Sequence, residues 1–362
     1  MAPKPKRALR RGWTTGACAA AAAGAAYAAL LTGRFPDPVT IRLPRGQTPA
    51  FALAFEHLEA DLARAGIVKD AGDDPDVTHG ALVIATVSRA AAGSGVTFRA
   101  GDGVGTVTMP GLPLAPGEPA INPVPRRMIA ETIAGLAAAH GAAGDVEVEI
   151  SIPGGRALAG RTWNPRLGIV GGLSILGTTG IVTPYSCAAW IHSIHRGVDV
   201  ARAAGSPLIG AATGRTSELA LRRAFGLPDT AIVDMGDFAG GLLKYLRRHA
   251  VPRLVIAGGF AKMTKLAQGF LDLHSGRSAV DFEWLAARLA GLGAPPSVLA
   301  GARAANTANE VLALAAAERL DLAGAVADAA RATARAALGP AAVAVGTLVV
   351  DRRGRIVGRA DG

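Results

Sequence analysis

The sequence predicts an α/β protein of two domains, an α+β strand-rich domain followed by a doubly wound, Rossmann-like α/β/α domain. The chain has 362 residues, more than one hydrophobic core usually serves. Strand patterns dominate the first 155 residues, and strands alternate with helices from Pro207 onward. We expect one domain over residues 1–160 and a second over residues 161–337. The C-terminal segment 338–362 is expected to return to the first domain.

In the first part, alternating or β-branched segments predict strands, and a glycine turn at residues 101–103 predicts a hairpin. A helix is expected where apolar residues recur with helical spacing, closed by Gly141. The expected elements are strands in residues 38–46, 51–61, 81–90 and 145–155, a hairpin in 94–109 and a helix in 126–141.

In the second part, each strand runs into a glycine turn and then a helix, which predicts right-handed βαβ units and a parallel sheet. The expected strands are residues 207–214, 230–236 and 253–259, and the expected helices are 215–226, 237–250, 261–274, 281–292, 304–318 and 325–337. Residues 343–360 predict a hairpin around Arg353 and Gly354. Because a terminal hairpin has unpaired edges, we expect it to dock on the strand-rich domain.

Composition narrows the function classes. Two cysteines, Cys18 and Cys187, form no disulfide framework or metal cluster, which favours a reducing compartment, the cytoplasm. The net charge of +10 comes from dispersed residues, with MAPKPKRALRR as the one basic run, so a small anionic substrate is favoured over nucleic acid. The charge-free stretch 167–195 contains repeated glycines and Pro184, so no membrane span is expected.

An acidic loop, VKDAGDDPDVTHG at residues 68–80, holds four aspartates beside Lys69 and His79. Turn formation by aspartate side chains is the simple explanation. Alternatively, like charges held close raise at least one pKa, which would make a general acid or base, or a divalent cation would relieve the repulsion. The candidates for the base are Asp70, Asp73 and Asp74.

Glycine-rich turns form a second group of candidates. NPRLGIVGGLSILGTTGIV, residues 164–182, could bring its backbone close to a ligand or could be a turn between buried strands, and it matches no phosphate-loop or dinucleotide signature. Its candidate residues are Gly171, Gly172, Ser174, Gly177, Thr178, Thr179 and Gly180.

The strand-to-helix turns of the second domain form a third group. Helix N-termini there favour an anionic group, with Thr216 or Ser217 as N-cap. Lys262 and Lys265 lie on one helical face, which could meet one anion or simply face solvent. His274 ends that helix, and His192 and His195 have a spacing that could hold a metal, although structural roles are expected for them. The cofactor candidates in these turns are Thr213, Gly214, Thr216, Ser217, Glu218, Gly258 and Gly259.

Several motifs occur in the order typical of one family. They are RRGWTTGACAAAA, VKDAGDDPDVTHG, NPRLGIVGGLSILGTTGIV, TGRTSE, KMTKLAQG followed by HS, and ANTANEVL. The chain thereby resembles the CbiD family, the C1-methyltransferases of cobalamin biosynthesis. The resemblance implies S-adenosylmethionine as methyl donor, cobalt-precorrin-5B as acceptor and cobalt-precorrin-6A as product. The chain departs from the family pattern at residues 183–187, TPYSC, where an acidic Glu-Pro-Met type of sequence is expected.

The resemblance also bears on residues 7–33, where Arg10 and Arg11 precede an alanine run as in an export signal. In the family this element begins the folded enzyme. Alanine favours helix formation, so we expect a helix from Ala19 to Leu31, N-capped by Thr14 or Thr15 and closed by Gly33.

With this resemblance, the turns 171–180 and 213–218 are expected to hold S-adenosylmethionine, with Glu218 near the ribose. The acceptor's carboxylates are expected to meet Thr14, Thr15, Lys69, Arg215, Lys262, Lys265 and the N-terminal arginines. The base is one of Asp70, Asp73, Asp74 or His274. Alternatives are a metal-free precorrin acceptor, a non-catalytic tetrapyrrole-binding protein and a nucleotide-dependent enzyme. Transient contact with other corrin-pathway enzymes and a homo-oligomer are compatible with the sequence, whereas nucleic acid and membrane partners are not expected.

Overall fold

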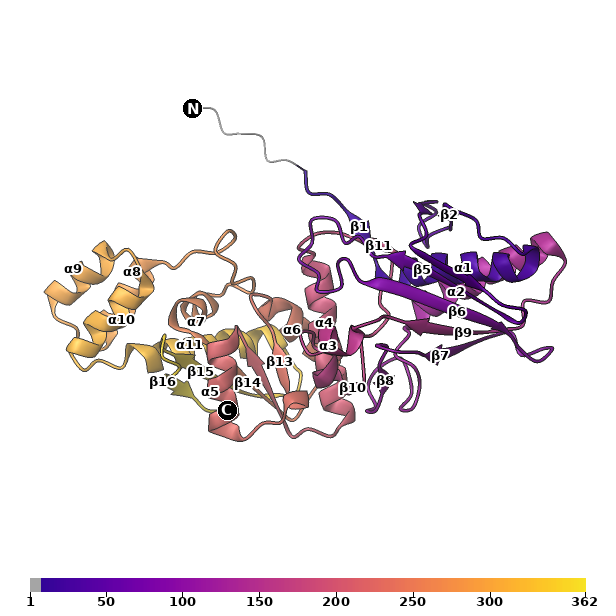
Figure 1. The fold of residues 1–362 in the computed structure, drawn as a ribbon. Helices are drawn as coiled ribbons and strands as arrows, with labels where there is room; N and C mark the ends of the chain where they lie inside the picture. The colour runs from indigo at the N-terminus through magenta and orange to yellow at the C-terminus, as the bar shows by residue number, and fades with distance from the viewer. Residues whose placement is uncertain (1–7) are drawn as a thin grey trace, which may run out of the picture. The chain divides into compact units, whose positions relative to one another are not determined.

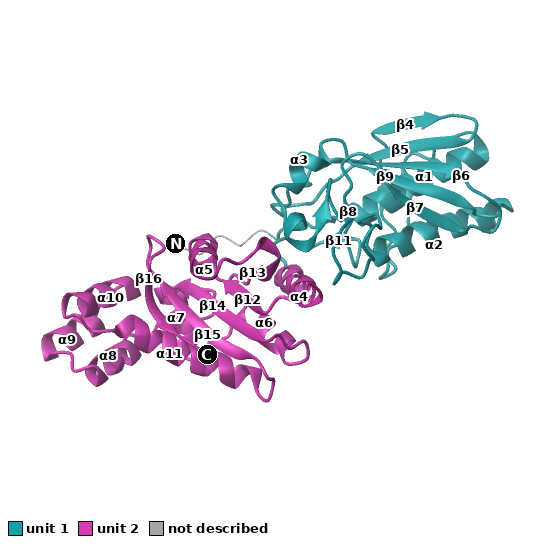
Figure 2. Ribbon diagram, turned by 90° about the horizontal axis from the view of Figure 1, so that it is seen from below, with its two compact units in different colours: residues 1–186 teal, residues 187–362 magenta. Residues whose placement is uncertain are grey.

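The protein divides into two compact units, Met1–Ser186 and Cys187–Gly362, which Figure 2 shows in different colours. The computed structural model describes residues 8–362, so the start of the basic run MAPKPKRALRR lies outside the described residues. Both units mix helices and strands, which confirms the α/β class. The boundary follows Ser186 rather than residue 160, so the glycine-rich stretch belongs to the first unit.

Unit 1 is built on a five-stranded sheet (Figure 1). The strand order is β4 (Phe55–Leu58), β5 (Leu62–Val68), β6 (Leu82–Arg89), β9 (Val146–Ser151) and β7 (Val96–Ala100). Neighbours are antiparallel except β7 and β9, which are parallel.

The hairpin predicted in residues 94–109 is wrong. Strand β7 pairs with β9, whereas β8 (Thr106–Val107) pairs with β10 (Ile169–Val170). Gly103 packs so closely on the following segment that a Cβ would lie 1.9 Å from the Ile152 carbonyl oxygen. The glycine turn therefore carries the chain away from the sheet instead of folding it back.

Shorter pairs complete this unit. Strand β1 (Gly12–Trp13) pairs with β11 (Ile181–Val182), and β2 (Val39–Thr40) pairs with β3 (Ala50–Phe51). A short helix, α3 (Gly155–Ala159), and a 3-10 turn, Asn164–Leu167, precede the glycine-rich stretch.

The alanine-rich segment forms helix α1 (Thr15–Thr32), which packs between the sheet and helix α2 (Pro123–His140). Thr14 is its N-cap, accepting from the Ala17 N–H, and Gly33 closes it at φ 77°, so both predicted caps are confirmed. By length and composition, α1 is the one helix in residues 8–362 that could cross a membrane, yet 89% of that stretch is buried inside the unit. Its place in the core accounts for its apolar character.

Small side chains allow α1 to approach its neighbours closely. A Cβ on Gly24 would lie 2.7 Å from Cγ2 of Thr132 on α2, and one on Gly16 would lie 2.7 Å from Cγ of Pro125. Glycine and alanine are required at this contact because a larger side chain would push the two helices apart.

Unit 2 contains a second five-stranded sheet, in the order β13 (Ile232–Asp234), β12 (Leu208–Ala212), β14 (Arg253–Gly259), β15 (Ala344–Val350) and β16 (Ile356–Ala360). The first four strands are parallel and β16 is antiparallel to β15.

The predicted docking of the C-terminal hairpin on the first domain is therefore wrong. Strand β15 pairs with β14 from Arg253 to Gly259, and six of its seven residues are buried. A near-continuous apolar run is typical of an interior parallel strand, and helix α11 (Leu322–Leu338) provides the crossover that returns the chain to this sheet.

Helices cover both faces of the unit 2 sheet (Figure 1). Helices α4 (Cys187–Ala203), α6 (Ala239–Leu246), α7 (Phe260–Ala267) and α11 contribute to one apolar core, and α5 (Arg215–Phe225) packs on the other face. The chain moves from β12 to one side for β13 and then to the other side for β14. The strand order thus reverses between β12 and β14, where open α/β sheets generally bind ligands.

Helices α8 (Phe282–Gly291), α9 (Pro296–Ala304) and α10 (Ala308–Ala317) form a separate group beside α7 and α11 (Figure 1). The sequence predicts one helix over 304–318, but the side chain of Thr307 accepts from the Glu310 N–H and starts α10 anew. Helix α9, with Pro296 at its first position, was not predicted.

Candidate functional site

Three stretches far apart in the sequence meet at the N-terminus of α1. The Trp13 N–H donates to the Asp70 carbonyl at 2.7 Å, and the Thr14 N–H donates to the Gly180 carbonyl at 3.0 Å. The Gly16 N–H donates to the Leu176 carbonyl at 2.8 Å. The acidic loop and the glycine-rich stretch therefore lie on either side of the residues that start α1. We call this meeting point, residues 10–16, 69–80 and 176–180, the unit 1 cluster.

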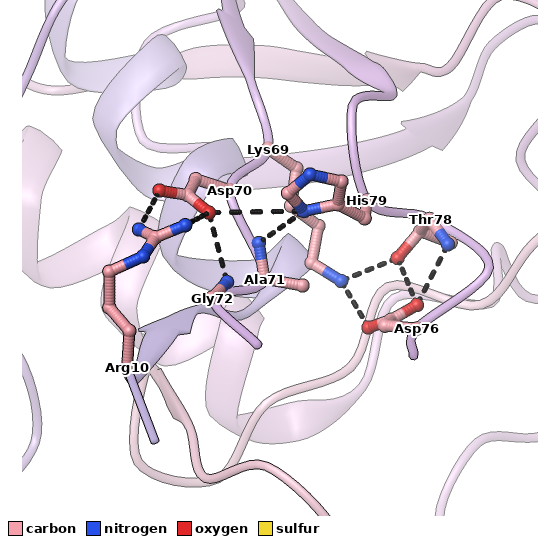
Figure 3. Close-up of polar contacts among 8 residues, drawn as sticks. All are labelled: Arg10, Lys69, Asp70, Ala71, Gly72, Asp76, Thr78 and His79. Carbon is pink, nitrogen blue, oxygen red and sulfur yellow. Dashed lines mark hydrogen bonds and ion pairs between the residues drawn. The ribbon is translucent and has the colours of Figure 1, made fainter. Parts of the chain in front are cut away.

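An arginine–aspartate pair faces solvent in the unit 1 cluster (Figure 3). The Arg10 guanidinium donates to both oxygens of Asp70, with Nη2 to Oδ1 at 2.9 Å, and the Gly72 N–H donates to Oδ1 at 2.9 Å. The His79 Nδ1 accepts from the Ala71 N–H at 3.0 Å and lies 3.8 Å from Asp70 Oδ1. The hydrogen bond from Arg10, followed by that from Gly72, lowers the pKa of Asp70 to about 2.

Lys69 lies inside the loop rather than on its surface. Its side chain is 2% exposed, and Nζ donates to the Asp76 carboxylate and the Thr78 hydroxyl (Figure 3). Burial acts to raise the pKa of Asp76, but the charge and hydrogen bonds of Lys69 and the bonds from Thr78 outweigh it, so this pKa is lowered. The Lys69 ammonium is thus enclosed by the protein, and the expected contact of Lys69 with substrate stays a prediction.

At Asp70 and Asp76 the pKa is lowered rather than raised, because each of these carboxylates has a cation of its own. The other two aspartates fasten the loop to distant backbone. Asp73 Oδ2 accepts from the Arg10 N–H at 2.7 Å, and Asp74 Oδ1 accepts from the Tyr185 N–H at 2.8 Å. Within residues 8–362 no group of three His, Cys, Asp or Glu side chains could hold a metal ion.

Most glycines of the glycine-rich stretch meet the protein's own chain. A Cβ would lie 2.3 Å from the Gly103 carbonyl oxygen at Gly172, 2.2 Å from Thr14 Oγ1 at Gly177, and 2.5 Å from Leu43 Cδ2 at Gly180. Only the Cβ direction of Gly171 is open among these four. The close approach that the glycines permit is therefore mainly to other protein segments.

The hydroxyls of this stretch serve local bonds. Ser174 Oγ donates to Asn164 Oδ1 at 3.1 Å, and Thr179 Oγ1 donates to the Ile181 carbonyl at 3.1 Å. Thr178 is exposed, and Thr15, the first residue of α1, is buried.

In unit 2, the candidate residues gather at the carboxyl ends of β12 and β14. The Lys262 ammonium donates to the Thr213 carbonyl at 2.9 Å and lies 2.9 Å from Asp237 Oδ1. These contacts join the segments that follow β12, β13 and β14. Gly258 faces Thr213, since its Cβ would lie 3.0 Å from Thr213 Oγ1. Gly214 at φ 156° and Gly259 both face open space. We call these residues the strand-end cluster: Thr213, Gly214, Asp237, Gly258, Gly259 and Lys262.

Helix α5 begins at Arg215 with Gly214 as its N-cap and without a side-chain cap, so the predicted Thr216 or Ser217 cap is wrong. Ser217 is buried and Oγ donates back to the Gly214 carbonyl at 2.8 Å. Arg215 and Thr216 are exposed. Because no side chain occupies the N-terminus, its first N–H groups are available to an anionic or polar ligand.

The remaining predicted residues have structural partners. Glu218 pairs with Arg222 at 2.8 Å, one turn along α5. Lys265 is 8% exposed and donates to the Leu273 carbonyl at 3.0 Å, so it does not share an anion with Lys262. His274 is exposed, with Nδ1 accepting from the Gly276 N–H at 3.1 Å.

The predicted site residues thus form two sets in different units. Arg10, Thr14 and the aspartates meet in unit 1, and Thr213, Gly258 and Lys262 meet in unit 2. The turns 171–180 and 213–218, expected to share one ligand, belong to different units. Sequence reasoning missed Asp237; an acidic residue just after the strand pattern TAIVDMG was the available signal.

Comparison with known proteins identifies relatives over nearly the whole chain. A protein from Paramagnetospirillum magneticum called cobalt-precorrin-5B C(1)-methyltransferase is 63% identical over 355 residues, covering 98% of this chain and 99% of its own length. One of the same name from Rhodospirillum rubrum is 62% identical over 354 residues and covers 97% of both chains.

A solved structure also matches, the cobalamin biosynthesis protein cbiD from Archaeoglobus fulgidus. It is 29% identical, with a TM-score of 0.40, covering 70% of this chain and 77% of that chain. Residues 2–184 match the family described as CbiD, and residues 272–361 match the description CbiD, C-terminal domain. The chain therefore belongs to the CbiD family.

Proposed function

We propose that this protein methylates ring carbon C1 of cobalt-precorrin-5B to give cobalt-precorrin-6A. The observation that carries the proposal is the identity of 60–63% over nearly the full length to proteins named for that reaction. Such similarity covers both units, including the unit 1 cluster and the strand-end cluster.

We propose S-adenosylmethionine as the methyl donor, and the strand-end cluster as its site. The donor supplies a methyl group activated on a sulfonium sulfur. Thr213, Gly214, Gly258 and Gly259 lie where the strand order reverses, and the uncapped N-terminus of α5 offers N–H groups to a polar ligand. A Cβ on Gly214 or Gly259 would meet no protein atom within 4 Å, so the backbone there is open to a ligand. Lys262, paired with Asp237, fixes the two strand ends relative to each other.

The protein's main task is to hold donor and acceptor in line, which can contribute about 7–11 kcal/mol to lowering the barrier. Asp70 is a poor base for any proton that the acceptor loses, since a carboxylate with a pKa of about 2 binds protons weakly near neutral pH. Asp73, Asp74 and His274 are retained as base candidates. Arg10 and Arg215, both exposed, are candidates for holding acceptor carboxylates.

The proposal is tested by titrating the protein with S-adenosylhomocysteine in a calorimeter, and by mass spectrometry of cobalt-precorrin-5B incubated with S-adenosylmethionine. We expect micromolar or tighter binding and the gain of one methyl group. Gly259→Ala adds a methyl into the open space and should weaken S-adenosylhomocysteine binding by about tenfold, whereas Gly291→Ala, also open but on α8, should leave it unchanged. No binding and no methylated product would refute the proposal.

The alternatives have distinct outcomes. A metal-free acceptor would be methylated in place of the cobalt form. A non-catalytic tetrapyrrole-binding protein would bind the macrocycle without binding S-adenosylhomocysteine, and a nucleotide-dependent enzyme would be stabilised against heat by ATP or NAD instead.

We further propose a cytoplasmic location and action on its own or in transient contact with other enzymes of the pathway. The free thiols of Cys18, which is buried, and Cys187, which is exposed, fit a reducing compartment.

A further inference from the structure

A groove of about 800 Å³ runs along α6 in unit 2, outside the strand-end cluster. Its walls come from α4, from α6 with the turn after it, and from the segment 271–277 that follows α7. The volume is in the range of ligand-binding pockets, which is about 300–1,000 Å³.

The charge of the groove is strongly one-sided. Four permanent cations line it, against a single carboxylate, Asp272, which already pairs with Arg277 at 3.2 Å. Arg247 donates to the Ala337 carbonyl, but neither Lys244 nor Arg248 forms an ion pair with a carboxylate of residues 8–362. Both side chains are exposed. Two cations are therefore free to bind an anionic ligand.

The wall of the groove includes a stack of three flat side chains. The rings of His195 and Tyr245 are 3.9 Å apart at 10°, and those of Tyr245 and His249 are 3.9 Å apart at 14°. The Tyr245 hydroxyl donates to Asp199 Oδ1 at 2.6 Å, and the His195 Nε2–H donates to the Gly241 carbonyl at 3.3 Å. These bonds fix the stack before any ligand arrives, with both faces of the Tyr245 ring covered by the two histidines.

The groove is tied to the strand-end cluster through backbone bonds. The Leu273 N–H donates to the Asp237 carbonyl at 2.9 Å, and the Gly240 N–H donates to the Leu271 carbonyl at 2.8 Å. Asp237 in turn pairs with Lys262. The groove and the proposed donor site are therefore joined by hydrogen-bonded backbone within unit 2.

We propose that this groove binds the carboxylate-bearing edge of the tetrapyrrole acceptor, through Lys244 and Arg248 beside the His195–Tyr245–His249 stack. The inference rests on the proposed function and names one subsite of it. The charge favours the acceptor over the donor, because S-adenosylmethionine has one carboxylate against a sulfonium and an ammonium that the cations repel, whereas the acceptor has several acetate and propionate groups. The faces of His195 and His249 that point away from Tyr245 are the ones on which a flat macrocycle can stack.

The test measures binding of cobalt uroporphyrin, a flat cobalt-tetrapyrrole octacarboxylate, and of S-adenosylhomocysteine to the full chain. In Lys244→Ala with Arg248→Ala, tetrapyrrole affinity should fall at least tenfold, and S-adenosylhomocysteine affinity should stay within twofold. The wild-type tetrapyrrole affinity should fall with salt more steeply than that of the double variant. The double variant Lys244→Gln with Arg248→Gln keeps part of each aliphatic stem. It should show the same loss of tetrapyrrole affinity as the alanine double variant.

The control, Arg303→Ala with Arg319→Ala, removes the same charge from exposed positions of unit 2 that do not line the groove, and it should retain wild-type tetrapyrrole affinity. Equal loss in this control would attribute the effect to net charge and overturn the inference. If both groove variants bound the tetrapyrrole as tightly as the wild-type protein, the inference would also be overturned. The proposed function would still stand in that case, provided that the protein binds S-adenosylhomocysteine and methylates the acceptor. If the wild-type protein bound neither cobalt uroporphyrin nor S-adenosylhomocysteine, both proposals would be refuted together.

Discussion

Replacing Lys69 by methionine should destabilise unit 1 substantially. The Lys69 side chain is 2% exposed and has two partners, Asp76 and Thr78. Methionine fills most of the same space but leaves the Asp76 carboxylate without its cation. Breaking a buried ion pair by removing one partner costs about 3–5 kcal/mol. Because Asp76 is 26% exposed and keeps its bonds from Thr78, we expect the low end, about 3 kcal/mol.

Hydrogen exchange of α1 and β5 amides under native conditions measures this loss in unit 1 alone, which matters because a chain with two units need not unfold in one step. Lys244→Met, an exposed site in unit 2, should change stability by less than about 0.5 kcal/mol. Lys69→Met combined with Asp76→Leu should recover over half of the loss, since an apolar pair replaces the ionic one. A loss below about 1 kcal/mol in Lys69→Met, or no recovery in the double variant, would refute the reasoning.

Three further outcomes follow from the structure. Thr14→Ala removes the N-cap of α1 and should cost about 1 kcal/mol in denaturant unfolding, with Thr14→Ser near wild type. Gly24→Ala should lower the free energy of unfolding by about 1–3 kcal/mol because its Cβ meets α2. Gly135→Ala, whose Cβ meets open space, should raise this free energy by up to about 1 kcal/mol. Carbon-13 NMR should show Asp70 titrating near pH 2 and returning toward 3.8 in Arg10→Ala. Since the folded pKa is lowered, the stabilisation from this pair is complete above pH 3.8 and is lost as pH falls through about 2; an unchanged titration in Arg10→Ala would contradict this.

Features that depend on a few neighbouring residues could be predicted from the sequence. Thr14 and Gly33 bound an alanine run, and the structure has a helix with those caps. Strands β12, β13 and β14, each before a glycine turn and a helix, were predicted within a few residues. In these cases the signal is local, since caps and turns depend on backbone geometry at one position.

Pairing between distant segments could not be predicted in the same way. The sequence of β15 identifies a strand, but its partner β14 is about ninety residues earlier, and helices α7 to α11 lie between them in the chain. The expectation that the terminal hairpin docks on the first domain treated β15 and β16 as a pair separate from the sheet of unit 2. The near-continuous apolar run of β15 was the signal for an interior strand, and the predicted hairpin with β16 around Gly354 is present as well.

The acidic loop shows why a motif can mark a site without specifying its chemistry. Sequence proximity of Asp70, Asp73, Asp74 and Asp76 suggests repulsion and a raised pKa, and this is correct only if no cation lies closer than the other aspartates. The structure provides two cations, Arg10 from 60 residues away and Lys69 from within the loop, and the sign of the shift reverses at Asp70 and Asp76. The same argument applies to the glycines: Gly177 adjoins Thr14 rather than open space. Both features hold the start of α1 in place, so in unit 1 the family motifs first build the local structure, and the exposed charged groups on it, Arg10 and Asp73, are the ones to test for contact with substrate.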